Sequence, residues 1–328
     1  MKYKVFGKTG WKVSEIGFGG WQLGGEFGHV EDADSIRTLL AAFERGINLV
    51  DTAQMYGKGR SEEVIGKALK LWKGDPIYVA TKVQPMAWPR PEEANPEMAG
   101  RYSREHIRTN CEKSLKRLGT ETIDLYQLHG WFPTGIEHTD WLEALRELQQ
   151  EGKIREFGVS VRDYRPEDGV EIAKTGWIAS EQVVYNLFEQ HPGGELFEAC
   201  QKHGVGVLAR VPFDEGSLIG NWNENTYETF GEKDVRKFYF RGERFMETYR
   251  AVEKMKAAIS AYTGEKEIKL HEYALKFCLS HEAVSCVIPG MKTISEMESN
   301  IRVSDSEKLD QGLLDILRPF NWPRNYHS

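Results

Sequence analysis

Short apolar runs rich in β-branched residues alternate with longer amphipathic stretches along the whole chain. This alternation is typical of βα units arranged around a parallel sheet. Eight apolar runs are predicted to be strands: 15–19, 47–50, 77–81, 123–128, 156–160, 180–184, 205–209 and 284–288. Segments with an apolar period of 3.6 residues are predicted to be helices: 33–45, 61–72, 104–118, 139–151, 165–174, 194–203 and 295–302.

Glycines support these boundaries, because a residue that tolerates positive φ commonly ends a helix. Five of them follow a helical pattern and precede a predicted strand: Gly46, Gly119, Gly152, Gly176 and Gly204. Eight strands alternating with helices over about 300 residues fit an α/β fold of the closed (β/α)₈ TIM barrel type better than an open doubly wound sheet. We therefore expect residues 1–328 to form a single domain.

Three segments lie outside the repeat. Residues 2–13 are predicted to form a β-hairpin that turns at Lys8-Thr9-Gly10 and plugs one end of the barrel. Residues 84–102 and 212–245 are long insertions after the third and seventh strands. Extended βα loops lie on the catalytic face of such barrels, so both are candidate pocket walls or lids, with a solvated surface loop as the alternative.

The composition is that of a soluble globular protein, with 40% apolar and 28% charged residues. A net charge of −7 offers no general attraction to nucleic acid or to anionic membranes, so neither is an expected partner. No apolar run approaches the ~18 residues that span a bilayer, and the N-terminus lacks the apolar region of a signal peptide. The four cysteines form no Cys-x-x-Cys pair. We expect a cytoplasmic protein, monomeric or homo-oligomeric, that acts on a small molecule.

Four ionisable residues of different types follow three consecutive predicted strands: Asp51, Tyr56, Lys82 and His129. Each alone has a structural explanation, as a helix cap, a core phenol, a surface amine or a buried imidazole. Together they form a candidate proton donor, because an ammonium beside a phenol lowers its pKa from about 10. A phenol tuned in this way is a useful general acid. His129 is then expected to orient the substrate oxygen or to share the proton.

Other chemistries find less support. The segment Gly158-Val-Ser160-Val-Arg162 departs from the Gly-x-Ser-x-Gly of hydrolases, and His271-Glu272 lacks the second histidine of a zincin, so no metal is predicted. No side chain donates hydride, so protonation of a carbonyl requires a nicotinamide cofactor. Gly204-Val-Gly206 ends a helix instead of opening one, which argues against a Rossmann site. Lys292, before the last predicted helix, is either a phosphate contact or an ordinary surface lysine.

Several motifs, in their order and spacing, resemble those of the aldo-keto reductases, most closely the bacterial members. They are Gly-Ile-Asn-Leu-Val-Asp51-Thr-Ala-Gln-Met-Tyr56-Gly, Ala-Thr-Lys82-Val, Asp-Leu-Tyr-Gln-Leu-His129, Phe-Gly-Val-Ser160, Gln182-Val-Val-Tyr-Asn and Val-Ile-Pro-Gly290. The resemblance runs from about Tyr3 to Arg302. It implies a (β/α)₈ barrel that reduces aldehydes or ketones with NADPH. It also implies that Tyr56 is the general acid, that Lys82 and Asp51 tune it, and that His129 orients the carbonyl.

The same resemblance implies the cofactor-binding residues: Gly20, Trp21, Asp51, Ser160, Gln182, Arg210, Pro212, Phe213, Gly216, Leu218, Gly290, Met291, Lys292 and Asn300. Ser160 and Gln182 correspond to the residues that bind the carboxamide, although Val161 replaces the usual asparagine. Arg210 stands where many members have an aromatic ring that stacks on the nicotinamide. We hypothesise that its positive charge disfavours the oxidised, cationic cofactor, so that the protein binds the reduced cofactor more tightly. Glu296 stands where some members have an arginine for the 2′-phosphate. NADP(H) is therefore predicted, with NAD(H) left open.

The resemblance also implies a substrate pocket lined by Trp21, Tyr56, Trp88, His129 and Trp131, with Trp222 or Trp322 as further candidates. Core packing is the alternative for each tryptophan. The predicted function is reduction of an aldehyde or ketone, with a sugar-derived compound as one candidate substrate. The alternative is a cofactor-binding, redox-sensing accessory subunit with little turnover. A glycoside hydrolase would need two facing carboxylates, which these strand ends do not supply.

Overall fold

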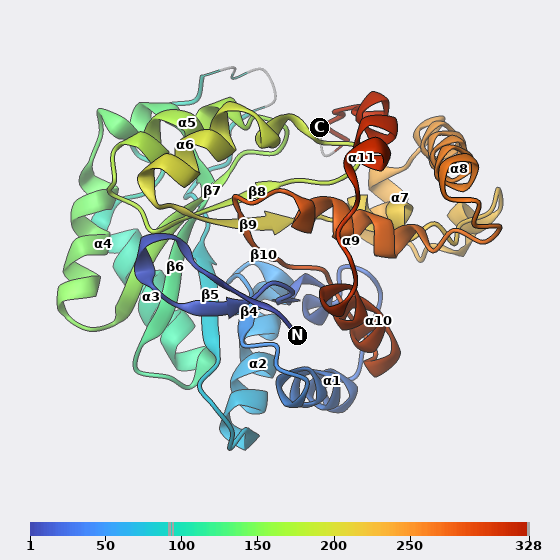
Figure 1. The fold of residues 1–328 in the computed structure, drawn as a ribbon. Coiled ribbons are helices and arrows are strands. Elements are labelled where there is room, and N and C mark those ends of the chain that lie inside the picture. Colours follow the sequence, from blue (N-terminus) through green and yellow to red (C-terminus); the bar gives the residue numbers. More distant parts are fainter. Residues whose placement is uncertain (91–92, 94, 327–328) are drawn as a thin grey trace.

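A computed structural model describes residues 1–90, 93 and 95–326, and it shows eight parallel strands in one curved sheet (Figure 1). The strands are β3 (Phe18–Gly19), β4 (Leu49–Asp51), β5 (Tyr78–Val83), β6 (Ile123–Trp131), β7 (Ile154–Val161), β8 (Ser180–Val184), β9 (Gly206–Arg210) and β10 (Val284–Val287). Each pairs with the next in chain order. Parallel bridges from Ile16 to Val287 and from Gly19 to Gly290 join the first strand to the last. The predicted barrel is confirmed.

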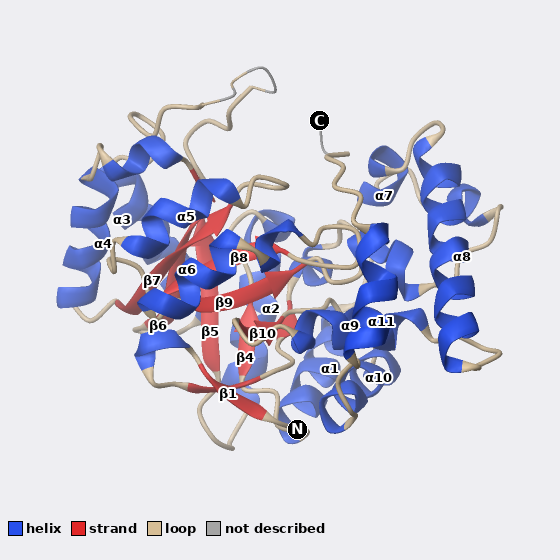
Figure 2. Ribbon diagram, turned by 45° about the horizontal axis from the view of Figure 1, so that its top comes forward, coloured by secondary structure: helices blue, strands red, loops and turns tan. Residues whose placement is uncertain are grey.

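Helices surround this sheet (Figure 2). Those that follow the strands are α1 (Asp32–Glu44), α2 (Arg60–Leu71), α3 (Arg104–Leu118), α4 (Asp140–Gln150), α5 (Glu167–Lys174), α6 (Glu195–His203), α9 (Leu270–Ser280) and α10 (Ile294–Asp305). All seven predicted helices are present to within a few residues. Gly119 and Gly204 end α3 and α6 with φ of +66°, as the sequence indicates.

The insertion after β9 contains helices that were not predicted, α7 (Val235–Tyr239) and α8 (Arg244–Thr263), and they lie outside the ring in both views (Figures 1 and 2). The helices α9 and α11 (Gln311–Leu317) were also missed. The signal for α8 was present, because its buried positions 245, 248, 252, 255 and 259 follow a helical period. The insertion after β5 lacks helix and strand in its described part, and its residues 91, 92 and 94 lie outside the described residues.

The predicted N-terminal hairpin is confirmed as β1 (Tyr3–Val5) paired antiparallel with β2 (Lys12–Ser14). Its residues Phe6, Trp11 and Val13 pack in one buried cluster with barrel residues such as Leu49 and Leu208. The hairpin therefore closes the amino-terminal end of the barrel. This leaves the opposite end, where parallel strands finish, for a site.

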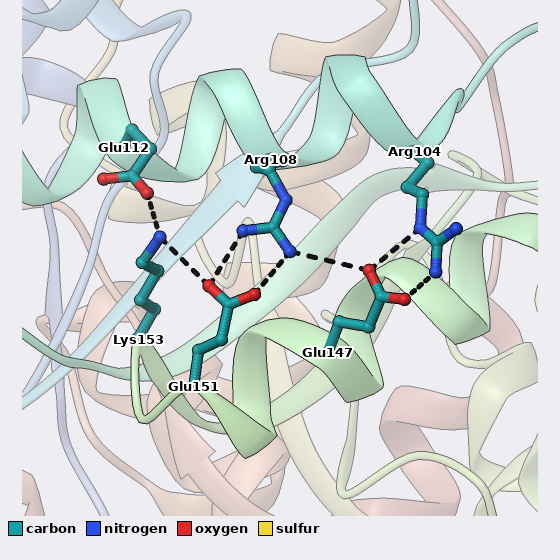
Figure 3. Close-up of polar contacts among 6 residues, drawn as sticks. All are labelled: Arg104, Arg108, Glu112, Glu147, Glu151 and Lys153. Carbon is teal, nitrogen blue, oxygen red and sulfur yellow. Dashed lines mark hydrogen bonds and ion pairs between the residues drawn. The ribbon is translucent and has the colours of Figure 1, made fainter.

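A ladder of alternating charges joins α3 to α4 (Figure 3). Its members, in order, are Arg104, Glu147, Arg108, Glu151, Lys153 and Glu112. Arg108 binds both oxygens of Glu151 at 2.8 and 2.6 Å, and Lys153 lies 3.0 Å from the same carboxylate. The ladder ties two neighbouring helices together at the outer surface.

Candidate active site

A cavity of about 1040 Å³ opens at the carboxyl ends of the strands. Its lining includes residues at the carboxyl ends of the strands, such as Gly19 on β3, Asp51 on β4 and Gln182 on β8, and it extends to Asn325 near the end of the chain. This volume is at the upper end of the roughly 300–1,000 Å³ of ordinary ligand sites. Both insertions contribute, the first through Trp88 and Pro89 and the second through Pro212, Phe213, Gly216 and Ile219. They are pocket walls, as predicted.

The four predicted catalytic side chains come together at this end of the barrel. Lys82 is fully buried on β5, and its Nζ donates to Asp51 Oδ2 at 2.7 Å and to the Thr52 carbonyl at 2.8 Å. The same Nζ lies 3.5 Å from the Tyr56 hydroxyl. The ring centroids of His129 and Tyr56 are 5.9 Å apart in an edge-to-face arrangement. Asp51, Tyr56 and His129 line the cavity, whereas Lys82 lies behind them.

Gln182 completes this cluster from β8. Its Nε2 donates to Asp51 Oδ1 at 2.7 Å, so both oxygens of the Asp51 carboxylate are engaged. A carboxylate held by two donors keeps a fixed orientation. It therefore fixes the position of the Lys82 ammonium beside Tyr56.

The pKa of Tyr56 is raised well above its usual value, first by burial and then by the Asp51 carboxylate. The lowered pKa expected from Lys82 is therefore not observed, because burial and the Asp51 carboxylate outweigh the effect of the nearby ammonium. Burial lowers the pKa of His129 well below its usual value, and the cations Lys82 and Arg210 act in the same direction. At neutral pH the cavity therefore presents a protonated phenol and a neutral imidazole, both able to donate a hydrogen bond to an oxygen.

Most residues predicted to bind a cofactor line this cavity: Gly20, Trp21, Asp51, Ser160, Gln182, Arg210, Pro212, Phe213, Gly216, Gly290, Met291, Lys292 and Asn300. Leu218 does not. Its side chain is fully buried in the core, and its N–H donates to the Phe213 carbonyl. The prediction of Leu218 as a cofactor contact is corrected accordingly.

Arg210 has a charged partner that the sequence did not indicate. Its Nη2 donates to the Val161 carbonyl at 3.1 Å and forms an ion pair with the Asp163 carboxylate. Asp163 and its neighbours Arg162 and Tyr164 also line the cavity. They follow β7 directly, so their place at a strand end was the signal that could have identified them.

Glu296 closes the N-terminus of α10. Thr293 and Glu296 form a capping box, and the Glu296 carboxylate accepts from the backbone N–H of Lys292 at 2.6 Å and of Thr293 at 3.3 Å. The helix cap therefore explains why a carboxylate lies beside the predicted phosphate site. The Glu296 carboxylate is held by the backbone N–H groups of the cap. The Thr-x-x-Glu spacing was readable in the sequence.

Two further cavity residues were missed because they come from segments distant in sequence. Arg236, from α7, pairs with Asp234 at 2.6 Å and lies near Lys292, whose Nζ donates to the Phe27 carbonyl. His271, from α9, shares a 2.8 Å hydrogen bond with Ser299. No short-range motif indicates such contacts.

The tryptophans divide into two groups. Trp21 lies 5.9 Å from Tyr56 with its ring tilted by 24°, and Trp88 meets the His129 ring edge-on at 5.9 Å. Both line the cavity. Trp222 packs in a separate aromatic cluster, and Trp322 packs on Phe188.

Trp131 is fully buried and donates its indole N–H to the Asp168 carbonyl, outside the cavity lining. Trp131 is two residues after His129, and on a regular strand the two side chains would point to the same face. The pairing register shifts between them, where Gly130 has φ of +123°. This irregularity turns Trp131 away from the cavity, so its prediction as a substrate contact is corrected.

The cavity suits a large, anionic, partly polar ligand. Buried polar atoms of three lining residues, Gln22 Oε1, His129 Nδ1 and Arg210 Nε, have no hydrogen-bond partner among the described residues. Lys292 and Arg236 place two cations at one end. A dinucleotide has the size and the phosphates that this donor set fits.

Within residues 1–90, 93 and 95–326, no group of three or more His, Cys, Asp or Glu side chains could hold a metal ion, and no helix is long and apolar enough to cross a bilayer.

Comparison with known proteins agrees with this geometry. The model of the aldo/keto reductase family matches residues 15–318. The uncharacterized oxidoreductase YqkF of Bacillus subtilis (strain 168) is 31% identical over 97% of this chain and 96% of its own. The holo form of the aldo-keto reductase AKR11C1 from Bacillus halodurans has a TM-score of 0.75 and 30% identity, covering 98% of this chain and 96% of its own.

A Klebsiella pneumoniae aldo/keto reductase in complex with NADP and acetate has a TM-score of 0.68 and 25% identity, with 98% of this chain and 96% of its own covered. The family match spans nearly the whole barrel. The chain belongs to the aldo/keto reductase family, whose members are NAD(P)H-dependent oxidoreductases.

Proposed function

We propose that this protein reduces a small aldehyde or ketone to the alcohol, with Tyr56 as the proton donor. The observation that carries this proposal is the buried arrangement in which Lys82 lies 2.7 Å from Asp51 and 3.5 Å from the Tyr56 hydroxyl. When bound, the reduced nicotinamide supplies the hydride that no side chain can. The Tyr56 proton passes to the carbonyl oxygen, and the ammonium of Lys82 stabilises the phenolate that remains.

His129 is proposed to hold the carbonyl oxygen. Its imidazole is neutral at pH 7 because burial and two nearby cations lower its pKa. A neutral imidazole can donate one N–H to the oxygen without competing with Tyr56 for the proton. Trp21 and Trp88 would then cover the faces of the substrate.

The cofactor is proposed to be NADP(H), with NAD(H) as the alternative. Ser160 and Gln182 would bind the carboxamide, residues Pro212 to Gly216 the pyrophosphate, and residues Gly290 to Lys292 with Asn300 the adenosine end. Arg236 joins this last group because it lies near Lys292. Arg210 would lie near the nicotinamide, with its charge offset by Asp163. The ratio of KM for NADPH and NADH tests the choice, and a clear preference for NADH would reject it.

Removing the Tyr56 hydroxyl tests the proposed chemistry. Tyr56→Phe is expected to lower kcat on aldehydes and ketones by about 10²–10⁴-fold, because only the proton source is lost. Binding of NADPH is expected to stay near that of the wild type. The measurement is NADPH absorbance with a panel of carbonyl compounds, and Tyr262→Phe, on the exposed face of α8, is the matched control.

Undiminished turnover of Tyr56→Phe would reject the role of Tyr56. Tight NADPH binding by the wild type without turnover of any compound would instead favour the accessory subunit. The intact contacts between Lys82, Asp51 and Tyr56 favour the enzyme.

A further inference from the structure

The loop from Val211 to Gly216 has an unusual backbone. Positive φ values occur at Val211 (56°), Asp214 (46°), Glu215 (54°) and Gly216 (102°). Only the glycine adopts such a conformation readily, and for the β-branched Val211 it is a rare one. Val211 also precedes a proline, which restricts it further towards extended conformations. A loop of this shape needs contacts that hold it in place.

The two sides of this loop have different surroundings. Val211, Pro212, Phe213, Glu215 and Gly216 line the cavity, whereas Asp214 is not part of the lining and is 1% exposed. Asp214 Oδ2 accepts from the Ser217 hydroxyl at 2.5 Å and from Arg324 Nη2 at 2.6 Å. The loop is therefore anchored from behind, on the side away from the cavity.

The anchor comes from the C-terminal segment, residues 321–326, in which Arg324 is 110 residues from its partner. The guanidinium carbon of Arg324 lies 4.3 Å from the ring centroids of both Phe188 and Trp322. The backbone N–H of Trp322 donates to the Phe188 carbonyl at 2.8 Å, which fixes the segment on the loop after β8. A guanidinium stacked in this way has little freedom to leave Asp214.

We propose that Arg324 is a positioning residue for the dinucleotide. Its ion pair with Asp214 holds the strained loop in the shape that receives the pyrophosphate, and it neutralises a buried carboxylate that would otherwise repel the phosphates. Arg324 lies outside the cavity lining, so it acts through the loop and not by contact with the cofactor. This inference rests on the proposed function, which assigns residues Pro212 to Gly216 to cofactor binding.

The test compares cofactor binding with turnover. For Arg324→Met we expect the Kd and KM for NADPH to rise about tenfold or more, with kcat at saturating NADPH within about twofold of the wild type, because the groups on β4, β5 and β6 are untouched. Arg324→Lys keeps the charge but loses the planar guanidinium. Its Kd for NADPH is therefore expected to lie between those of the wild type and Arg324→Met, about threefold above the wild type.

The matched control is Arg117→Met, which removes another arginine from a buried carboxylate, Glu62, at 2.5 Å. Neither residue lines the large cavity. This variant is expected to lower the melting temperature without changing the Kd for NADPH. A similar loss of binding in Arg117→Met would show that affinity simply follows stability, and it would overturn the proposal.

A folded Arg324→Met protein that binds NADPH within about twofold of the wild type also overturns the proposal. If that variant does not fold, Arg324→Lys decides the question, because an unchanged Kd overturns the role and a raised Kd with unchanged kcat supports it. A wild-type protein that binds neither NADPH nor NADH would overturn the proposed function itself. That outcome is distinct from a failure of the Arg324 proposal, because it is measured on the wild type alone.

Discussion

Glu181 is a buried carboxyl group that the proposed chemistry does not use. It precedes Gln182 on β8, so its side chain points to the opposite face of the strand, towards α5. A Cβ built on Gly169 of α5 would come within 2.4 Å of its Oε2. Glu181 is fully buried, and neither carboxyl oxygen has a hydrogen-bond partner among the described residues. Burial raises its pKa well above the usual value, so it keeps its proton at neutral pH.

This proton links stability to pH. The unfolded chain releases it above about pH 4.3 while the folded protein keeps it, so the contribution of Glu181 to stability falls by about 1.4 kcal/mol per pH unit until the folded pKa is reached. Glu181→Gln cannot ionise. We expect its free energy of unfolding, relative to the wild type, to increase steadily from pH 5 to pH 8 in urea titrations. A difference independent of pH would contradict the protonated state of Glu181.

At the scale of elements, the charge ladder between α3 and α4 offers the opposite dependence on pH. Hydrogen bonds from Arg108 and Lys153 lower the pKa of Glu151 to about 2. A lowered pKa stabilises the fold above the unfolded value of about 4.3, and this contribution is lost as the pH falls towards 2. The ladder is exposed, so salt also weakens it.

Glu151→Gln is therefore expected to lower the melting temperature slightly at pH 7 and low salt. In about 1 M salt, or near pH 2, the difference from the wild type should vanish. NADPH binding should not change, because Glu151 lies outside the cavity lining. Glu121→Gln, at an exposed position before β6, is the control for a generic change of surface charge. A loss that persists in high salt would show that packing, not charge, is responsible.

Elements and side-chain directions were not equally predictable from the sequence. The strands were predicted because buried parallel strands form continuous apolar runs, and Asp51, Lys82 and His129 because strand ends converge in such a barrel. Trp131 was assigned to the cavity because the irregularity at Gly130 leaves no mark in an apolar pattern. The partners of Arg210 and Asp214 depend on how distant segments pack, and no local pattern contains that information.

At the scale of the whole molecule, the cavity connects the two ends of the chain. Its lining extends from Gly19 to Asn325, and the bridge from Gly19 to Gly290 helps to close the barrel at the same place. A ligand bound in this cavity would lie against the ends of the first and last strands together. We therefore infer that residues 1–328 unfold as one domain and that the cofactor stabilises all of it.

Thermal unfolding with and without cofactor tests whether the chain unfolds as one domain. A ligand that binds only the folded state at 100 times its Kd raises the free energy of unfolding by about 2.7 kcal/mol. We expect calorimetry to show one cooperative transition, which NADPH moves as a whole to higher temperature, and the Arg324→Met variant to need a higher NADPH concentration for the same shift. Two transitions, of which NADPH moved only one, would mean that part of the chain, such as the region of α7 and α8, unfolds separately from the barrel.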